Sequence, residues 1–579
     1  MSAQLFVRLT KTRMAWAGTV GCVCLSAALV TTWPLAINAS NAIPLGTEQE
    51  PTVPLFNLWS LWWTADRIAH GFAHYWDAPF FHPNKGVFTY SEPQFLTGLM
   101  VAPLWFLDAP PALIYNLAVW ALLTLNGVFA YRLARALELP SLSALLSGVL
   151  TVTLPFVANV YGVLQLIALF GILWTLEGLV RFGRSGTTRS ALWAAAGFLA
   201  TFLTCQQYAL LFAPFAGAAG LVALAQNRYR MVAALRLISS SLVMGLIVLL
   251  VAFPALMVHA ELGFRRSERI VQALSARPGD FLTRPVTALV RFPPPDPADT
   301  AGLFPGAILS GLALAGVAIG VRDPQRRRWT AYLVGTAVIA ALLALGLNLR
   351  LGGWRPFATV RLILPGLEGL RSPFRFAVIT QLAFPFLAAI TLAWARQFLT
   401  IRGAGYIVAL VGLLAAGENL TVPMPLTMVP PSPRTLWSAW LREQPDTTVV
   451  AHLPFPAGMH VSDYEIEAWR LFAQIDHRKP IVNGYSGYFP QARRPDGVVI
   501  PTYTQFQLAM ATRFPDHRLL CVLDKSLGAN TLIIGQGWLA GHKSQMDAHA
   551  DFLRPVYADE KVRIYSLLAP EGKCRPGTW

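Results

Sequence analysis

Three glutamates near the start of the chain have the residue type and the setting for acid–base chemistry. Glu48 and Glu50 come soon after the first long apolar run, and Glu92 lies in the turn sequence Tyr-Ser-Glu-Pro. A carboxylate held beside a hydroxyl group can act as a general base. A carboxylate in a loop is more often a solvated charge, so spacing alone does not choose among the three.

Polar side chains also occur inside the apolar runs. Gln165 and Glu177 share one run, and Asn126 lies in another. Polar groups at membrane depth are costly to bury, so they are functional candidates. Glu177 has a simpler interpretation, because Arg181 follows it by one helical turn and can pair with it.

The composition is that of a membrane protein. Of the 579 residues, 55% are hydrophobic and only 13% are charged, whereas soluble domains carry about 25% charged residues. The net charge of +16 comes with arginines beside apolar runs, which is typical of topological signals and lipid contact rather than nucleic-acid binding. The ten histidines form no metal-ligand pattern. The sequence therefore predicts no metal and no cofactor, and it leaves dependence on a divalent metal open.

The apolar runs predict a mainly α-helical, polytopic transmembrane bundle of about eleven spans, because roughly 20 apolar residues cross a bilayer as a helix. The first run is too long for a typical signal peptide, and we interpret it as a retained signal-anchor helix. The predicted spans are Met14–Ile37, Ala112–Tyr131, Ser141–Val160, Leu164–Val180, Ser190–Thr204, Tyr208–Ala225, Leu237–Met257, Phe304–Val321, Thr330–Leu349, Phe374–Trp394 and Ala404–Leu420.

The arginines of the short loops decide the orientation. They all fall on the side of the N-terminus if the run around Cys205 forms two spans rather than one kinked helix, which places them in the cytoplasm. The tail and three long segments, Asn38–Pro111, His259–Leu303 and Arg350–Pro373, then lie outside. The arginines are Arg132, Arg135, Arg181, Arg184, Arg189, Arg228, Arg230, Arg322, Arg326, Arg327, Arg328, Arg396 and Arg402.

We predict a membrane domain over residues 1–425, with its first outer loop over 38–111, and a small extracytoplasmic α/β domain over 430–579. In the loop, Leu55–Ala69 has the pattern of an amphipathic helix lying on the outer leaflet, and Gln94–Leu107 that of an interfacial or re-entrant segment. In the tail, Cys521 and Cys574 can pair in an oxidising space, although their separation decides nothing. The tail is predicted to contain strands at Thr447–Phe455, Thr531–Ile534 and Val562–Leu567, and helices at Ser462–Ile475, Pro515–Ser526 and Gly541–Phe552.

Several segments, taken in order, resemble bacterial membrane proteins of the GT-C glycosyltransferase superfamily. Enzymes of this superfamily move a sugar from a polyprenyl-phosphate donor to an acceptor on the outer face, with an acidic residue, usually Asp, in the first outer loop. The matching stretch here has Glu48 and Glu50 instead. The segments are TWPLAINASNAIPLG, FNLWSLWW, FFHPNKGVFTYSEP, LIYNL, GVLQLIALFGILW, LFPG, LRSPFRF and NGYSGYFP.

The resemblance implies a glycosyltransferase of the bacterial inner membrane that acts on an envelope glycan, lipid or protein. Glu48 or Glu50 would be the general base, with Glu92 as second choice. Arg371 and Arg375 of LRSPFRF would hold the lipid phosphate through bidentate hydrogen bonds. Their simpler interpretation is anchoring at the membrane interface.

Gln165 and Tyr485 complete the candidate substrate-binding residues. Tyr485 belongs to NGYSGYFP, which is equally typical of a tight loop that closes a domain. The implied partners are a lipid-linked donor and membrane lipids, with no nucleic acid, and the oligomeric state is open. Alternative functions are a lipid-linked glycan flippase, an envelope assembly partner, or a transferase of another lipid-linked group. Few charges lie at mid-membrane, which favours surface chemistry over a flippase path.

The orientation is testable with a cysteine substituted for Ser432 in the tail. In intact cells, a membrane-impermeant thiol reagent is expected to label Ser432→Cys, because the tail is predicted to be external. Labelling that requires permeabilised cells would reverse the orientation of the last spans.

Overall fold

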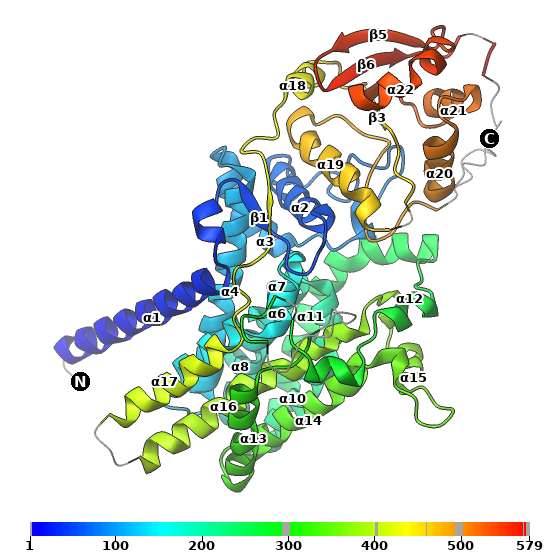
Figure 1. Cartoon of the computed structure of the whole chain (residues 1–579). Coiled ribbons are helices and arrows are strands. Elements are labelled where there is room, and N and C mark those ends of the chain that lie inside the picture. Colours follow the sequence, from blue (N-terminus) through cyan, green and yellow to red (C-terminus); the bar gives the residue numbers. More distant parts are fainter. Residues whose placement is uncertain are drawn as a thin grey trace. The chain divides into compact units, whose positions relative to one another are not determined.

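The computed structural model describes residues 3–285, 287–291, 302–399, 403–458, 460–491, 502–570 and 572–574, with side chains from Trp16 onward. Most of these residues are helical (Figure 1). The chain forms two compact units. The helical unit comprises Met1–Thr47, Asn116–Val251 and Arg265–Leu426, and the α/β unit comprises Glu48–Tyr115, Ala252–Phe264 and Thr427–Trp579. Arg402 and part of the predicted outer segment 259–303 lie outside the described residues.

Nine of the eleven spans predicted from the sequence each overlap one helix. The other two, Ser141–Val160 and Leu164–Val180, are each broken into two helices. Helices α2 and α3 are described with the α/β unit below. The other helices up to α17 are α1 (Ala3–Thr31), α4 (Pro111–Ala136), α5 (Ser141–Val152), α6 (Pro155–Asn159), α7 (Leu164–Ile167), α8 (Phe170–Ser185), α9 (Thr188–Thr204), α10 (Gln206–Gln226), α11 (Arg230–Leu262), α12 (Glu268–Ala273), α13 (Ala307–Arg322), α14 (Arg327–Ala344), α15 (Pro356–Ile363), α16 (Ala377–Phe398) and α17 (Ala404–Gly417).

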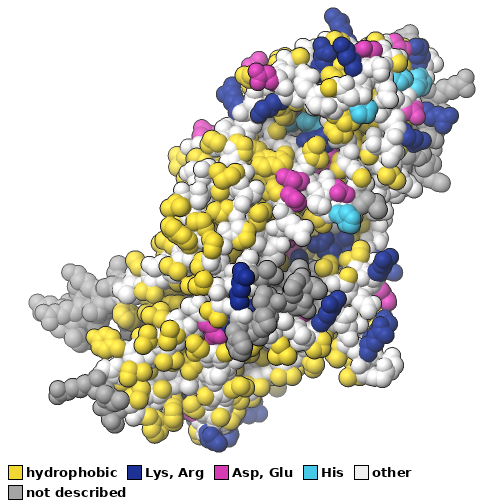
Figure 2. Space-filling view, in the orientation of Figure 1, with side chains coloured by type: hydrophobic (Ala, Val, Ile, Leu, Met, Phe, Trp, Pro, Cys, Tyr) yellow, Lys and Arg dark blue, Asp and Glu magenta, His cyan; other side chains and the backbone are white. Residues whose placement is uncertain are grey.

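The chain is a multi-pass membrane protein. Hydrophobic side chains cover much of the surface seen in Figure 2, and the most apolar stretch of α11 has no buried residue. Four shorter apolar helices cover Trp16–Thr31, Phe95–Phe106, Ala307–Arg322 and Ala404–Gly417. The number of spans therefore stays a prediction. In the described part of the chain, six helices are long and apolar enough to cross a membrane: Pro111–Ala136, Ser141–Asn159, Leu164–Ser185, Gln206–Gln226, Arg230–Leu262 and Pro373–Phe398.

The run around Cys205 forms two antiparallel helices, as predicted. Helix α9 packs antiparallel to α8, and α10 packs parallel to α8, so the chain reverses at the extended residue Cys205. A single kinked helix is thereby excluded. The contacts that fix these directions join Gly171 to Thr201, Gly178 to Ala194, Leu166 to Tyr208 and Gly183 to Ala223.

A buried ion pair holds the start of α13 in the helical unit. The Glu418 carboxylate accepts the backbone N–H groups of Ala307 and Ile308, at 2.6 and 2.8 Å. It also pairs with Arg284, whose guanidinium donates to the Glu418 carbonyl oxygen at 2.9 Å. Both side chains are buried. The carboxylate thus satisfies N–H groups that a helix leaves without an intrahelical partner.

The same contact explains the LFPG sequence before α13. Gly306 has φ +100°, and a Cβ there would lie 2.7 Å from the Asn419 side-chain oxygen. The Asn419 amide in turn donates to the Pro305 carbonyl oxygen at 2.9 Å. Only glycine fits this close approach at a positive φ, so the LFPG sequence has a structural role.

The α/β unit has a four-stranded mixed sheet in the order β3-β4-β6-β5. β3 and β4 are parallel, with Val450 opposite Thr531, and the other pairings are antiparallel. The three predicted strands are confirmed, while β5 is an additional strand with several exposed residues. The elements are α2 (Thr52–Ala69), α3 (Phe95–Phe106), α18 (Leu436–Arg442), β3 (Val450–Leu453), α19 (Glu465–His477), α20 (Tyr503–Arg513), α21 (His517–Cys521), β4 (Thr531–Gly535), α22 (Gln536–Asp547), β5 (Leu553–Ala558) and β6 (Val562–Leu567).

Two predicted boundaries in the tail are wrong. The last helix covers Gln536–Asp547 rather than Gly541–Phe552, because the chain turns into α22 directly after β4. Ser462 does not cap α19; it begins a 3₁₀ turn, and α19 follows from Glu465. The disulfide that the sequence left open is present between Cys521 and Cys574, with Cα atoms 5.5 Å apart.

The predicted surface position of α2 is also wrong. The helix exists, but every residue from Pro54 to Asp66 is buried. Trp59 is fully buried, stacks with Trp63 at 5.7 Å between ring centroids, and donates to the Gln474 side chain of α19 at 3.1 Å. Large aromatic side chains on several faces favour a core position over a membrane surface. Helix α3 does expose apolar side chains, so its interfacial position stays a prediction.

The ion pair at α13 yields a stability prediction. Glu418→Gln removes one partner of a buried pair, which typically costs about 3–5 kcal/mol. The thermal unfolding midpoint of the purified protein in detergent is expected to fall, whereas Glu443→Gln, at an exposed site in the tail, is expected to leave it unchanged. Equal midpoints for the two variants would show that the pair contributes no stability.

Candidate functional site

Glu50 forms a carboxylate pair with Glu465 in the α/β unit. A hydrogen bond to Glu465 raises the pKa of Glu50, and the repulsion between the two charges and partial burial raise that pKa further. Glu465 also accepts a hydrogen bond from the Trp469 indole at 3.1 Å. Two carboxylates in contact favour a state in which they share one proton. Such a pair can take up or release a proton at a higher pH than an isolated glutamate.

The pair lies where two helices begin. Glu50 precedes α2, Glu465 is the first residue of α19, and the Thr52 hydroxyl donates to the Val461 carbonyl oxygen at 3.3 Å. At the other end of α2, Asp66 pairs with Arg478 beyond the end of α19, at 3.3 Å. The two helices therefore run in the same direction, and both positive dipole ends face the carboxylate pair.

Tyr485 contacts α2 and Tyr464, the residue that precedes α19. Its ring packs edge-on against Phe56 of α2, at 5.7 Å between centroids, and against Tyr464 at 5.5 Å. Burial raises the pKa of Tyr464, so its hydroxyl stays protonated. Glu50 and Glu465 are thus in contact, and Tyr485 packs on Tyr464, the residue next to Glu465.

Glu48 and Glu92 are both half-buried in the same unit. Glu48 interacts electrostatically with the buried hydroxyl of Tyr115. The residue before Glu92, Ser91, accepts the backbone N–H of Gly487 at 2.8 Å. Glu92 therefore follows a segment that is attached to the NGYSGYFP loop.

The NGYSGYFP loop is fixed by hydrogen bonds to the first outer loop and to β3. The backbone N–H of Phe81 donates to the Asn483 carbonyl oxygen at 3.0 Å. The Asn483 side chain exchanges hydrogen bonds with the His452 backbone, and it donates to buried Glu467 at 3.0 Å. Arg470 pairs with Glu467 at 2.7 Å. These hydrogen bonds give the loop a structural role in the α/β unit, and Tyr485 belongs to this fixed loop.

Arg371 and Arg375 lie in the helical unit. Arg375 donates to the side chain of Gln207, which follows the turn at Cys205. Arg371 is half-buried and, within the described part of the chain, has no hydrogen bond or ion pair. A half-buried guanidinium of this kind can accept an anionic ligand. The sequence did not suggest Gln207 as a candidate, because no sequence pattern connects it to Arg375, which lies far along the chain.

Gln165 lies in the short helix α7, at a break between α6 and α8. The Asn126 side chain spans the break, accepting from the backbone of Leu169 and donating to that of Ile167, both at 2.8 Å. The Gln165 side-chain oxygen is buried and has no hydrogen-bond partner among the described residues. Asn126 therefore has a structural role, and Gln165 keeps an unused acceptor.

The glutamates and Tyr485 belong to the α/β unit, whereas Arg371, Arg375 and Gln165 belong to the helical unit. Their meeting at one site stays a prediction. Glu465 was missed as a partner of Glu50, since no sequence pattern connects residues so distant. Over the described residues, no group of three histidine, cysteine or acidic side chains is placed to hold a metal ion.

No protein-family model matches the sequence, and no curated protein matches it. Among solved structures, the arabinofuranosyltransferase AftD from Mycobacteria superposes with a TM-score of 0.57 and 15% identity. The match covers 96% of this chain and 40% of that chain. The chain has the GT-C glycosyltransferase fold. The resemblance stated from the sequence is thereby confirmed at the level of the fold.

Two further GT-C structures superpose more loosely. The archaeal oligosaccharyltransferase AglB from Archaeoglobus fulgidus, in complex with an inhibitory peptide and a dolichol-phosphate, gives a TM-score of 0.43 at 11% identity over 97% of this chain and 75% of that chain. ArnT from Cupriavidus metallidurans, in the apo state, gives 0.38 at 12% identity over 98% of this chain and 100% of that chain. The chain spans only two fifths of the length of AftD, and a shared fold does not fix a shared reaction.

Proposed function

We propose that the protein is a membrane glycosyltransferase that moves a sugar from a polyprenyl-phosphate donor to an acceptor on the outer face of the membrane. The acceptor is an envelope glycan, lipid or protein. The observation that carries the proposal is the Glu50–Glu465 pair in a chain with the GT-C fold. Glu50 lies in the segment between the first apolar helix and α2. We further propose that the bundle has about eleven spans in a bacterial inner membrane, with the N-terminus cytoplasmic. The proposed domains are residues 1–425 and 430–579.

Glu50 is the proposed general base. Its raised pKa brings it closer to the working pH, where a base is most effective. The acceptor hydroxyl gives its proton to the carboxylate as its oxygen forms a bond to the anomeric carbon. The bond from that carbon to the phosphate oxygen breaks, and its electron pair leaves with the polyprenyl phosphate. Glu48 and Glu92 are the alternative bases.

The donor phosphate is proposed to bind Arg371 and Arg375. Support comes from Arg371, which has no internal partner within the described residues and lies four positions before Arg375. Gln165 and Tyr485 are the proposed contacts of the sugars, through an unused amide oxygen and a half-exposed aromatic ring.

A flippase or an assembly partner is the alternative. A flippase needs a polar path through the bundle, but the polar side chains of the helical unit mostly serve its own backbone. Gln381, for example, accepts from Phe156 N–H at 2.9 Å and donates to the Leu303 carbonyl oxygen at 2.8 Å. This arrangement favours chemistry at the surface.

The base is tested by replacing each candidate with glutamine. Glu50→Gln is expected to lower the rate of sugar transfer by roughly 10²–10⁴-fold, measured with purified protein and a panel of polyprenyl-phosphate sugars. Glu465→Gln removes the cause of the raised pKa, so the rising limb of the pH profile of kcat/KM is expected to move to lower pH. Glu560→Gln, an exposed carboxylate of the same unit, is the matched control.

Parental turnover in Glu48→Gln, Glu50→Gln and Glu92→Gln alike would remove the general base from this loop. An unchanged pH profile in Glu465→Gln would instead assign the proton transfer to a carboxylate other than Glu50.

The donor site is tested at Arg371. Lysine keeps the charge but loses the planar fork that binds phosphate through two bonds. Arg371→Lys is expected to weaken donor binding by roughly 10–100-fold, measured by titration with a fluorescent polyprenyl phosphate. Arg350→Lys, an exposed arginine of the same outer segment, should bind as the parent does. Equal affinity in both variants would exclude bidentate recognition by Arg371.

A further inference from the structure

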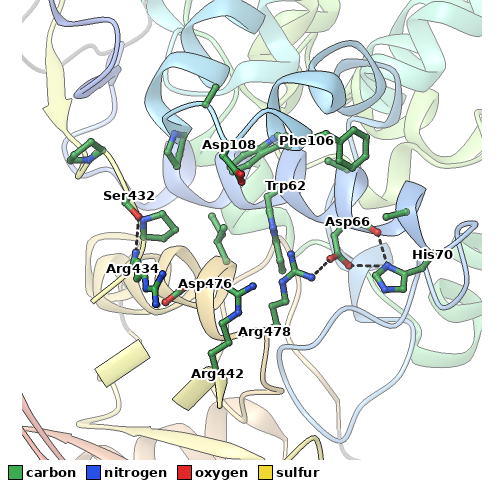
Figure 3. A pocket seen from close by; sticks show the side chains of 18 residues that line it. Trp62, Asp66, His70, Phe106, Asp108, Ser432, Arg434, Arg442, Asp476 and Arg478 are labelled. Atoms are coloured by element: carbon green, nitrogen blue, oxygen red, sulfur yellow. Dashed lines mark hydrogen bonds and ion pairs between the residues drawn. The ribbon is translucent and has the colours of Figure 1, made fainter. Parts of the chain in front are cut away.

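A cavity of about 430 Å³ lies within the α/β unit, at the end of α2 away from Glu50. The last turns of α2 and α19, the end of α3 and the segment Pro431–Arg434 enclose it (Figure 3). Because α2 has 18 residues, it is about 27 Å long. The cavity is therefore separate from the carboxylate pair.

The cavity is lined by three aspartates, three arginines and one histidine, His70. Asp66 pairs with Arg478 at 3.3 Å, and Asp476 pairs with Arg442 at 3.4 Å. Both aspartates are more than nine-tenths buried, and the Ser438 hydroxyl donates to Asp476 at 2.6 Å. These bonds fix the carboxylates and guanidinium groups of the wall before any ligand arrives.

Two further charges at the cavity are not used by the protein. Asp108 and Arg434 both line it (Figure 3). In the part of the chain that the structure describes, neither side chain forms an ion pair. Asp108 can therefore accept and Arg434 can donate hydrogen bonds to a ligand, whereas the other charged side chains of the wall pair with one another.

Aromatic rings complete the lining. Trp62, Trp105 and Phe106 line the cavity. An aromatic ring offers a flat apolar face to a ligand.

We propose that this cavity binds a neutral saccharide. Three aspartates and three arginines line it, so their charges cancel and favour neither an anion nor a cation. A hydrophobic ligand would cover Asp108 and Arg434, which form no ion pair among the described residues, and covering them without partners is costly. A sugar offers hydroxyl groups that donate to Asp108 and accept from Arg434, and its C–H faces pack on aromatic rings. The site stands whether or not the chain transfers sugar.

The test measures binding without a donor, so that it stays separate from any transfer assay. The full-length protein in phosphatidylcholine nanodiscs is titrated with neutral hexasaccharides of mannose, arabinose, galactose and glucose, and with an anionic galacturonate hexamer. At least one neutral hexasaccharide is expected to bind, as measured by saturation-transfer NMR. Asp108→Asn and Arg434→Ala should each weaken that binding by about tenfold or more, without loss of folding, because neither residue has an internal ion-pair partner.

The matched controls are Asp547→Asn and Arg554→Ala, two exposed residues of the same unit away from the cavity. They should bind as the parent does. Binding of the galacturonate alone, binding of no hexasaccharide, or equal affinity in the cavity and control variants would each overturn the proposal.

Discussion

The structure depends on one constraint: polar backbone groups exposed where helices break inside an apolar unit must find partners within the protein. No water is available in a bilayer core to satisfy them. Asn126 serves the break between α7 and α8, Gln381 serves the start of α6, and Glu418 serves the start of α13. Each of these side chains bonds to backbone that is distant in sequence, so it also fixes how the segments pack. The irregular segments of the helical unit are stable because these few polar residues hold them.

This constraint separates structural polar residues from candidates for chemistry. Glu177 is fully buried, and it is balanced by Arg181 at 2.6 Å and by Arg132 at 3.0 Å. It has no capacity left for a ligand. Arg371 and the oxygen of Gln165, by contrast, have no such internal partner among the described residues. The residues that the backbone does not use are the ones that support the proposed function.

Sequence patterns predicted the features that depend on residues close together in the chain. Apolar runs gave the positions of the helices, and Arg181 was recognised as the partner of Glu177 because one helical turn separates them. The burial of α2 could not be predicted, since it depends on Gln474 and the rest of α19 from the far end of the chain. The pairing of Glu50 with Glu465 escaped prediction for the same reason. The sequence of an aromatic helix near a membrane is the same whether lipid or protein covers the helix. Only the residues that pack against it in the folded chain distinguish a surface helix from a buried one.

The parallel arrangement of α2 and α19 places two helix dipoles side by side in the α/β unit. Helix N-termini carry partial positive charge and C-termini partial negative charge, so two helices that begin together make one end of the pair favourable to acids and the other to bases. Glu50 and Glu465 lie at the first end. At the second end Asp66 pairs with Arg67 and Arg478, and Asp476 pairs with Arg442, so arginines there balance both the dipoles and the aspartates. The contact with Glu465 raises the pKa of Glu50, whereas helix dipoles favour the charged carboxylate. One helix pair thus holds both the proposed base and the wall of the proposed saccharide site, and its core around Trp59 keeps them apart.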